Sequence, residues 1–204
     1  MNFQEDDLYK TIDFPSEEIL YKEKNSKFFG YTFPVTSEDE VKEILERLKK
    51  EHFSARHWCY AYQIGTEKIQ YRVNDDGEPN NSAGIPIYGQ IQSFEVTNVL
   101  VVVVRYFGGV KLGVGGLISA YKIAAQMALE NSEIVERTID KHFIISFGYA
   151  NMNKVMRIIK EKNLQIVSQK MEMDCEIEIA TRKKNVQNLL DTLENLYEIK
   201  LTEI

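Results

Sequence analysis

Five glycines stand in the stretch RYFGGVKLGVGG (105–116), which directly follows the apolar run NVLVVVV (98–104). A glycine-rich turn from a buried strand into a helix leaves backbone N–H groups accessible, and the helix dipole adds attraction for an anion. Lys111 lies inside the stretch and Arg105 at its entrance, so cationic side chains are available as well. The pattern matches neither a P-loop nor a dinucleotide fingerprint. It predicts either a phosphate-binding turn or a turn whose glycines only supply positive φ angles and close packing.

On the phosphate-binding hypothesis, the loop amides approach a nucleic-acid backbone, and Tyr106 or Phe107 stacks on a base. The residues predicted to bind nucleic acid or phosphate are Arg105, Tyr106, Gly108, Gly109, Lys111, Gly113, Gly115 and Gly116.

A second group of polar residues is DDGEP (75–79). Its carboxylates, Asp75, Asp76 and Glu78, are of the type that ligates a hard cation or performs acid–base chemistry. The spacing lacks the ladder of a calcium loop, and Asp-Gly is a common turn dipeptide, so a turn with solvated charges is the alternative interpretation. Of the histidines, His57 is kept as a site candidate because it lies on a predicted strand beside Trp58.

No Ser-His-Asp, Gly-x-Ser-x-Gly, Cys-x-x-Cys or His-Glu-x-x-His pattern occurs. His52 and His142 lack metal-ligand spacing, and Cys59 and Cys175 are interpreted as buried reduced thiols. We therefore predict no metal, no cofactor and no catalytic residues, so that a noncatalytic protein is favoured over an enzyme.

The elements that position these residues follow from hydrophobic periodicity and turn residues. Ser37 and Glu40 form a capping-box pattern at the start of a helix, and the non-alternating run before the glycines indicates a strand buried on both faces. The predicted strands of the first part are 17–24, 26–35, 57–64, 68–73 and 98–107, and its helices are 37–52, 83–92 and 117–132.

From residue 140 the pattern restarts, with strands at 141–150, 164–170, 172–180 and 197–204 and helices at 151–163 and 183–196. The order βαββαβ is that of a ferredoxin-like domain. An α+β protein with domains at 1–136 and 137–204 is expected, with its boundary near 132–140 and frayed residues at the start of the chain.

The formal net charge of -6 argues against polyanion binding by overall field. Lys plus Arg and Asp plus Glu balance from residue 139 onward, so the excess acidity lies in the N-terminal part and any nucleic-acid surface must be a local patch. Apolar runs are far shorter than the roughly 20 residues of a membrane span, and the N-terminus lacks a secretory signal pattern. A cytoplasmic protein without a membrane partner is predicted.

The motifs HWCYAYQI, RVNDDGEPNNSAGIPI and NVLVVVVRYFGGVKLGVGGLISAY, with the βαββαβ tail, resemble the IMPACT family, in particular its bacterial YigZ-type members. The resemblance implies an N-terminal α/β sandwich like the second domain of a small-subunit ribosomal protein, followed by a ferredoxin-like domain. That pair is similar to the last two domains of elongation factor G. Two positions depart from the family pattern: Val114 replaces a small hydroxyl residue, and Ser119 replaces a residue that is often basic.

Eukaryotic IMPACT is linked to translational control through the starvation-response kinase pathway, so the resemblance implies binding to RNA, the ribosome or a translation factor. The alternative is a small-molecule or peptide hydrolase that uses the DDGEP carboxylates and His57 in a pocket closed by the loop. A protein-interaction role for the ferredoxin-like domain is a third possibility, with Lys183 and Lys184 exposed in a monomer or weak dimer. The pocket candidates are His57, Asp75, Asp76, Gly77, Glu78, Pro79, Ala83 and Gly84.

Overall fold

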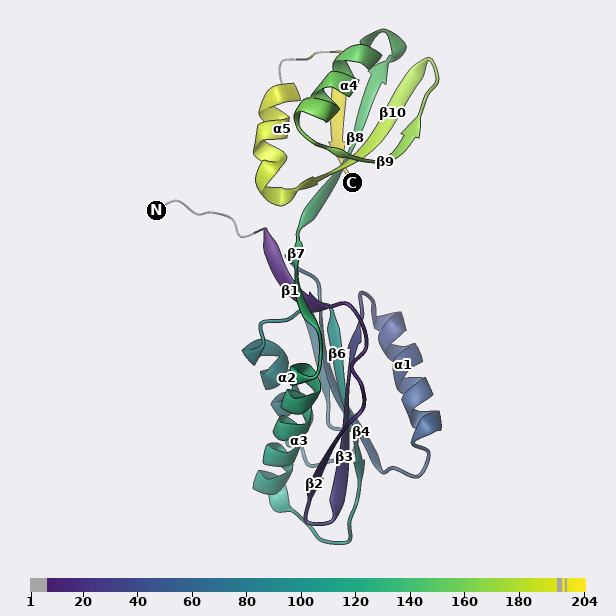
Figure 1. Cartoon of the computed structure of the whole chain (residues 1–204). Coiled ribbons are helices and arrows are strands. Elements are labelled where there is room, and N and C mark those ends of the chain that lie inside the picture. Colours follow the sequence, from purple (N-terminus) through teal and green to yellow (C-terminus); the bar gives the residue numbers. More distant parts are fainter. Residues whose placement is uncertain (1–6, 194–195, 197) are drawn as a thin grey trace, which may run out of the picture. The chain divides into compact units, whose positions relative to one another are not determined.

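The computed structural model describes residues 7–193, 196 and 198–204, which fall into two compact units (Figure 1). Residues 9–137 form the N-terminal unit, and the described residues of 138–204 form the C-terminal unit together with Asp7 and Leu8. Asp7 groups with the C-terminal unit because its carbonyl accepts the N–H of Ile139 at 2.7 Å and its carboxylate pairs with Arg182 at 2.9 Å. Fraying was expected at the start of the chain, where residues 1–6 lie outside the described residues.

The N-terminal unit contains a five-stranded sheet in the order β2-β3-β6-β4-β5, in which all neighbouring strands are antiparallel. Helix α1 covers one face of this sheet, and α2 and α3 cover the other (Figure 1). The elements are β2 (Ile19–Glu23), β3 (Ser26–Pro34), α1 (Glu38–Glu51), β4 (His57–Ile64), β5 (Gln70–Asn74), α2 (Gly84–Ser93), β6 (Val99–Tyr106) and α3 (Gly113–Glu130).

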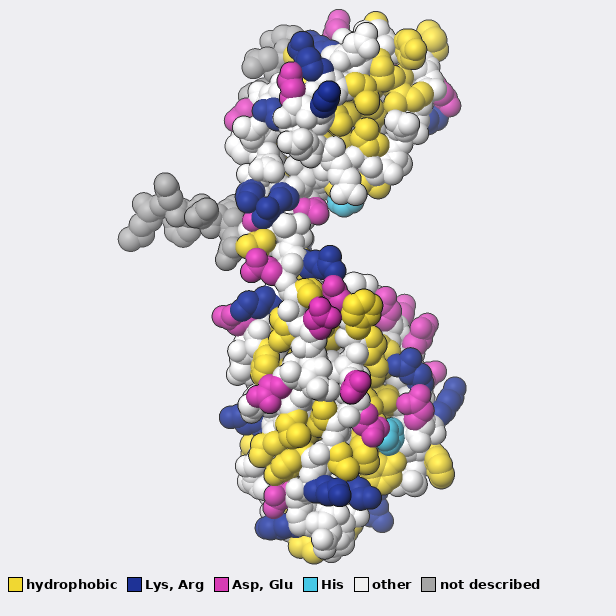
Figure 2. Space-filling view, in the orientation of Figure 1, with side chains coloured by type: hydrophobic (Ala, Val, Ile, Leu, Met, Phe, Trp, Pro, Cys, Tyr) yellow, Lys and Arg dark blue, Asp and Glu magenta, His cyan; other side chains and the backbone are white. Residues whose placement is uncertain are grey.

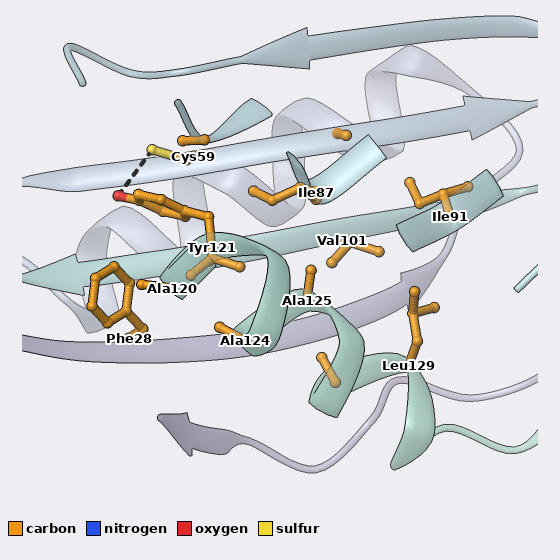
Figure 3. Close-up of a cluster of buried hydrophobic side chains, with 14 of the residues drawn as sticks. Phe28, Cys59, Ile87, Ile91, Val101, Ala120, Tyr121, Ala124, Ala125 and Leu129 are labelled. Atoms are coloured by element: carbon orange, nitrogen blue, oxygen red, sulfur yellow. Dashed lines mark hydrogen bonds between the residues drawn. The ribbon is translucent and has the colours of Figure 1, made fainter. Parts of the chain in front are cut away.

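Strand β6 is the central strand of this sheet, and its apolar run is buried on both faces as predicted. Val101 and Val103 pack with α2 and α3, whereas Val102 and Val104 pack in the cluster on the α1 side. Figure 3 shows the first of these clusters, in which Tyr121 of α3 lies among small side chains of its own helix and reaches toward β4. An unbroken run of branched residues is needed here because both faces of the strand are covered.

Helix α1 begins as predicted, because Ser37 and Glu40 form a reciprocal capping box. Helix α3 begins at Gly113, four residues before the predicted start at 117, so that prediction was wrong. Gly113 has a φ of +74°, which lets the chain reverse directly into the helix. The glycines in the first turn lower helix propensity by about 1 kcal/mol each, which the buried face of an 18-residue helix outweighs.

Strands β1 (Leu8–Ile12) and β7 (Ile134–Thr138) pair with each other in a two-stranded sheet that the sequence did not predict. Strand β7 occupies the segment that was expected to be only a boundary. The two strands are more than one hundred residues apart, so no local periodicity reports their pairing. Arg137 also pairs with Asp13 at 2.6 Å, beside this small sheet.

The C-terminal unit has the predicted βαββαβ order, and its antiparallel sheet has the strand order β11-β8-β10-β9. One face of the sheet forms a core with the helices, in which Phe143, Ile145 and Ile177 are buried. The elements are β8 (Asp140–Gly148), α4 (Met152–Glu161), β9 (Gln165–Lys170), β10 (Asp174–Arg182), α5 (Val186–Leu193) and β11 (Ile199–Glu203).

The α+β fold class is therefore confirmed. The predicted end of the last helix at 194–195 and the predicted start of the last strand at 197 lie outside the described residues. Cys59 and Cys175 are both buried and form no disulfide. Within the part of the chain that the structure describes, no helix has the length and apolar character needed to cross a lipid bilayer.

Candidate phosphate-binding pocket

A pocket of about 480 Å³ in the N-terminal unit brings together members of the two groups of residues that the sequence analysis singled out separately: His57, Glu78 and Pro79 from one, and Arg105, Lys111 and Gly113 from the other. It lies where the start of β4, the DDGEP turn, the end of β6 and the first turn of α3 meet. Its volume falls within the usual range for small-ligand sites. The residues that line it are Arg56, His57, Glu78, Pro79, Arg105, Phe107, Lys111, Leu112, Gly113, Val114 and Leu117.

Arg105 forms part of the wall of this pocket and is buried, with only 6% of its side chain exposed. Its Nη1 donates to Glu78 Oε1 at 2.6 Å, and its Nη2 donates to the Ser26 hydroxyl at 3.4 Å. The sequence predicted that Arg105 contacts phosphate from the loop entrance. The structure instead shows a buried ion pair between β6 and the DDGEP turn, so any contact with a ligand takes place from inside the pocket wall.

The same carboxylate also accepts a hydrogen bond from the hydroxyl of Tyr121, at 2.8 Å from Glu78 Oε1. Burial raises the pKa of Tyr121, and the nearby Cys59 and Glu78 add to the effect, so this hydroxyl remains a donor. Two donors on one carboxylate offset much of the cost of burying its charge. Glu78 is thereby held in place by two donors from different elements, β6 and α3.

One nitrogen of the Arg105 guanidinium nevertheless makes no hydrogen bond within the described part of the chain. Its Nε is buried and has no hydrogen-bond acceptor among the residues that the structure describes. The guanidinium carbon lies 5.5 Å from the centroid of the Phe28 ring and 5.6 Å from that of Phe107. Buried polar atoms are rarely left unpaired, and such an atom beside a pocket is a reason to look for a ligand there.

Cys59 ends this chain of polar contacts and is not suited to nucleophilic chemistry. Its Sγ lies 3.3 Å from the Tyr121 hydroxyl, as the dashed line in Figure 3 marks, and 3.0 Å from the carbonyl of Asp75. Burial raises the pKa of the Cys59 thiol well above its usual range. The nucleophile is the thiolate, so a thiol that stays protonated is chemically inert.

The first carboxylate of the DDGEP turn stabilises the start of α2. Asp75 Oδ1 accepts the N–H groups of Ala83 and Gly84 at 2.9 and 2.8 Å, and Oδ2 accepts the N–H of Asn81 at 2.9 Å. These are N–H groups that a helix terminus leaves free, so Asp75 acts as a cap from outside the helix. Ala83 and Gly84, predicted as pocket candidates, lie at this cap and do not line the pocket.

The second carboxylate holds the turn against β4. Asp76 Oδ2 accepts the N–H of Trp58 at 2.7 Å, and its backbone carbonyl accepts Nδ1–H of His57 at 2.9 Å. Asp76 and Gly77 both have positive φ, which is typical of a tight turn. His57 Nε2 lies 3.9 Å from Glu78 Oε1, so Glu78 is the carboxylate of this turn that pairs with His57.

The glycine stretch is divided between a loop and a helix. Gly108 is required sterically, because a Cβ there would lie 2.0 Å from the backbone of Asn25. At Gly115, by contrast, a Cβ would meet no atom within 4 Å and φ is not positive, so open space lies over the first turn of α3. Gly108, Gly109 and Lys111 lie in the loop, whereas Gly113, Gly115 and Gly116 lie in that first turn.

The first turn of α3 is open to an anion. No side chain caps it, and no acidic residue lies within it. Lys111 and Arg56, both exposed, have no salt-bridge partner among residues 7–193, 196 and 198–204, and Arg56 lies over the Phe107 ring at 5.8 Å. The helix dipole and these cations favour negative charge at the same place.

Two aromatic residues behave differently from each other at the end of β6. Phe107 lines the pocket and is 38% exposed, as a stacking platform requires. Tyr106 belongs to the cluster on the α1 side, and its hydroxyl bonds to His52 Nδ1 at 2.9 Å.

Arg56 was missed by the sequence analysis. Its N–H donates to the carbonyl of Arg105 at 3.1 Å, so the pairing of β4 with β6 is the signal that places it beside the loop.

Comparisons with known proteins agree with this architecture. The model of the Impact N-terminal domain matches residues 24–129, which is more than half of the chain. A Haemophilus influenzae protein named IMPACT family member is 32% identical over 180 residues, covering 85% of this chain and 86% of the relative. The Escherichia coli IMPACT family member YigZ is 28% identical over 152 residues, covering 74% of each chain.

A crystal structure of a hypothetical protein has the same fold, with a TM-score of 0.72, 24% sequence identity, and coverage of 97% of this chain and 98% of that one. The matched domain contains the pocket, the DDGEP turn and the glycine stretch. The chain belongs to the IMPACT family.

Proposed function

We propose that this protein is a noncatalytic regulator of translation that binds structured RNA or the ribosome through the surface around the pocket. The observation that carries the proposal is the convergence of Lys111, Arg56 and the uncapped first turn of α3 beside the exposed ring of Phe107. Cations and backbone amides contact phosphate, and an exposed aromatic ring stacks on a base. Membership of the IMPACT family supports a role in translation, which the resemblance implies.

The charge distribution is consistent with a local binding surface and not with a general one. Figure 2 shows basic and acidic side chains intermixed over the visible face of the molecule. The pocket differs from this average, because three cationic side chains line it against the single carboxylate of Glu78. RNA binding at such a site must weaken as salt rises, because cations on the phosphates are released when it forms.

Sedimentation of cell lysate on sucrose gradients at low and high salt tests this proposal. The variant Arg56→Ala/Lys111→Ala is preferred to any change at Arg105, because both residues are exposed and support no buried charge. We expect the native protein to comigrate with ribosomal particles at low salt and this variant to stay at the top of the gradient.

Arg47→Ala/Lys50→Ala, on α1 at the other face of the sheet, is the matched control and is expected to sediment as the native protein does. It also removes one arginine and one lysine. The exposed ion pair of Arg47 with Glu51 that is lost contributes little to stability. Native protein that remains free at every salt concentration would refute the proposal.

The hydrolase alternative has less support from the geometry. A general acid or base must be free to exchange a proton with the substrate, whereas Asp75 and Asp76 are engaged by backbone N–H groups. Glu78 remains beside His57, but it is already held by Arg105 and Tyr121.

A further inference from the structure

We propose that the pocket beneath the glycine loop binds one nucleotide, with its phosphate at the first turn of α3 and its base against Phe107. This inference rests on the proposed function, because it names the group that the surface recognises. The shared chemistry is a phosphate monoester on a sugar that also carries a flat base. A free nucleotide and the phosphorylated end of an RNA strand both carry it.

The charge of the lining favours an anion. Arg56, Arg105 and Lys111 are set against Glu78, whose carboxylate already accepts from Arg105 and Tyr121. Arg56 and Lys111 have no carboxylate partner in the part of the chain that the structure describes. In a protein with a net charge of -6, this lining is a local exception. It is an excess of positive charge that a phosphate group would balance.

The backbone provides directed donors at the same place. Gly113 and Val114 line the pocket at the start of α3, where the first N–H groups of the helix have no intrahelical acceptor and no side-chain cap. Gly113 has no side chain, so a phosphate oxygen in the pocket can come close to the backbone at this turn.

A separate observation comes from the pocket wall. Arg105 is 94% buried, as only 6% of its side chain is exposed, and its Nε–H is a donor without a described acceptor. Among the described residues this guanidinium pairs with one carboxylate, that of Glu78, and an anion with several acceptor oxygens beside the uncapped helix terminus would give it a second anionic partner. The helix terminus and this arginine therefore point to the same kind of ligand.

The apolar part of the lining indicates that the ligand carries an apolar or aromatic group as well as a phosphate. Pro79, Leu112 and Leu117 line the pocket with Phe107, and inorganic phosphate would leave these surfaces uncovered. The Phe107 ring has guanidinium carbons at 5.6 and 5.8 Å from its centroid, so one flat platform lies next to the cations. Base stacking on such platforms tolerates every base, because each base has a π face.

Isothermal titration calorimetry of the full chain with AMP, adenosine and inorganic phosphate tests the proposal directly. We expect AMP to bind at least about tenfold more tightly than either of its parts, because stacking and phosphate contacts both contribute. Arg56→Ala/Lys111→Ala should weaken AMP binding by about tenfold or more and reduce its salt dependence, whereas Arg47→Ala/Lys50→Ala should leave both unchanged.

A second variant separates the ring from the charges. Phe107→Leu keeps an apolar side chain at this position, so we expect a normal fold, a loss of AMP affinity of about tenfold and unchanged affinity for phosphate. Absence of AMP binding, or equal affinities for AMP and adenosine, would overturn the inference. An AMP titration curve of Phe107→Leu that matches that of the native protein would also overturn it.

Two oligonucleotides identify the source of the nucleotide. A 5′-phosphorylated RNA hexamer that binds more tightly than its 5′-hydroxyl counterpart, and at least as tightly as AMP, assigns the site to an RNA end. Binding of AMP without the phosphorylated hexamer assigns it to a free nucleotide. Ribosomal comigration without AMP binding would overturn this inference alone, and AMP binding without comigration would overturn the proposed function alone.

Discussion

Arg105 Nη1 and Glu78 Oε1 lie 2.6 Å apart inside the N-terminal unit, and this ion pair joins the end of β6 to the DDGEP turn, 27 residues away in the sequence. Both side chains are almost fully buried, and the Tyr121 hydroxyl donates to the same carboxylate oxygen. The pair therefore positions one wall of the pocket.

Breaking this pair from one side is expected to destabilise the fold strongly. Arg105→Ala leaves the Glu78 carboxylate buried without its cation, which should lower the free energy of unfolding by roughly 3–5 kcal/mol. Urea denaturation followed by circular dichroism measures the change. Arg105→Met/Glu78→Gln removes both charges and keeps an acceptor for Tyr121, so it should cost less than the single change. A loss below about 1 kcal/mol for Arg105→Ala would contradict the structural role of the pair.

The two glycines with opposite surroundings provide a matched test. Gly108→Ala places a Cβ 2.0 Å from the Asn25 backbone and should cost about 2–3 kcal/mol of unfolding free energy. Gly115→Ala meets no neighbour within 4 Å and should stabilise α3 by up to about 1 kcal/mol. Thermal unfolding of both variants measures the difference. Equal melting temperatures would show that the surroundings of these glycines are not as described.

Asp75 is expected to act as a helix cap and not as a catalytic acid. Asp75→Ala removes the acceptor of three backbone N–H groups, including those of Ala83 and Gly84, and should destabilise the N-terminal unit by roughly 1–2 kcal/mol. Asp75→Asn keeps one acceptor oxygen and should lose less. Chemical denaturation of the two variants provides the ranking, and the reverse order would count against the cap.

Because the Cys59 thiol is buried, we expect the free energy of unfolding to fall at alkaline pH. Burial raises its pKa above the ordinary value of 9.0, so the folded thiol stays protonated where the unfolded thiol ionises. Its contribution is therefore fully present below pH 9.0 and declines as pH rises above that value, by about 1.4 kcal/mol for each pH unit.

Cys59→Ser replaces the thiol with a donor that does not titrate in this range. The slope of unfolding free energy against pH is measured by denaturant titration from pH 8 to about 10. In the variant it should become less negative, by an amount that grows with pH toward about 1.4 kcal/mol per pH unit near pH 10. An unchanged slope in the variant would show that Cys59 does not remain protonated in the fold.

Local sequence was sufficient for the elements whose signals lie within a few residues. The capping box of Ser37 and Glu40 predicted the start of α1, because both halves of that motif lie on one turn. The unbroken apolar run of β6 predicted a strand covered on both faces, and the period changes after residue 140 predicted the βαββαβ unit. In each case burial of an element follows from its own periodicity.

Tertiary structure decided what depends on distant partners. The sequence analysis predicted that Arg105 contacts phosphate from the loop entrance. In the structure, the antiparallel pairing of β4 with β6 sets His57 opposite Arg105. This pairing brings the DDGEP turn within hydrogen-bonding distance of both side chains. The same pairing adds Arg56 to the pocket, and the pairing of β1 with β7 spans most of the N-terminal unit. Hydrogen-bond partners and ion pairs of this kind are determined by strand register, which the composition and spacing of a single segment do not encode.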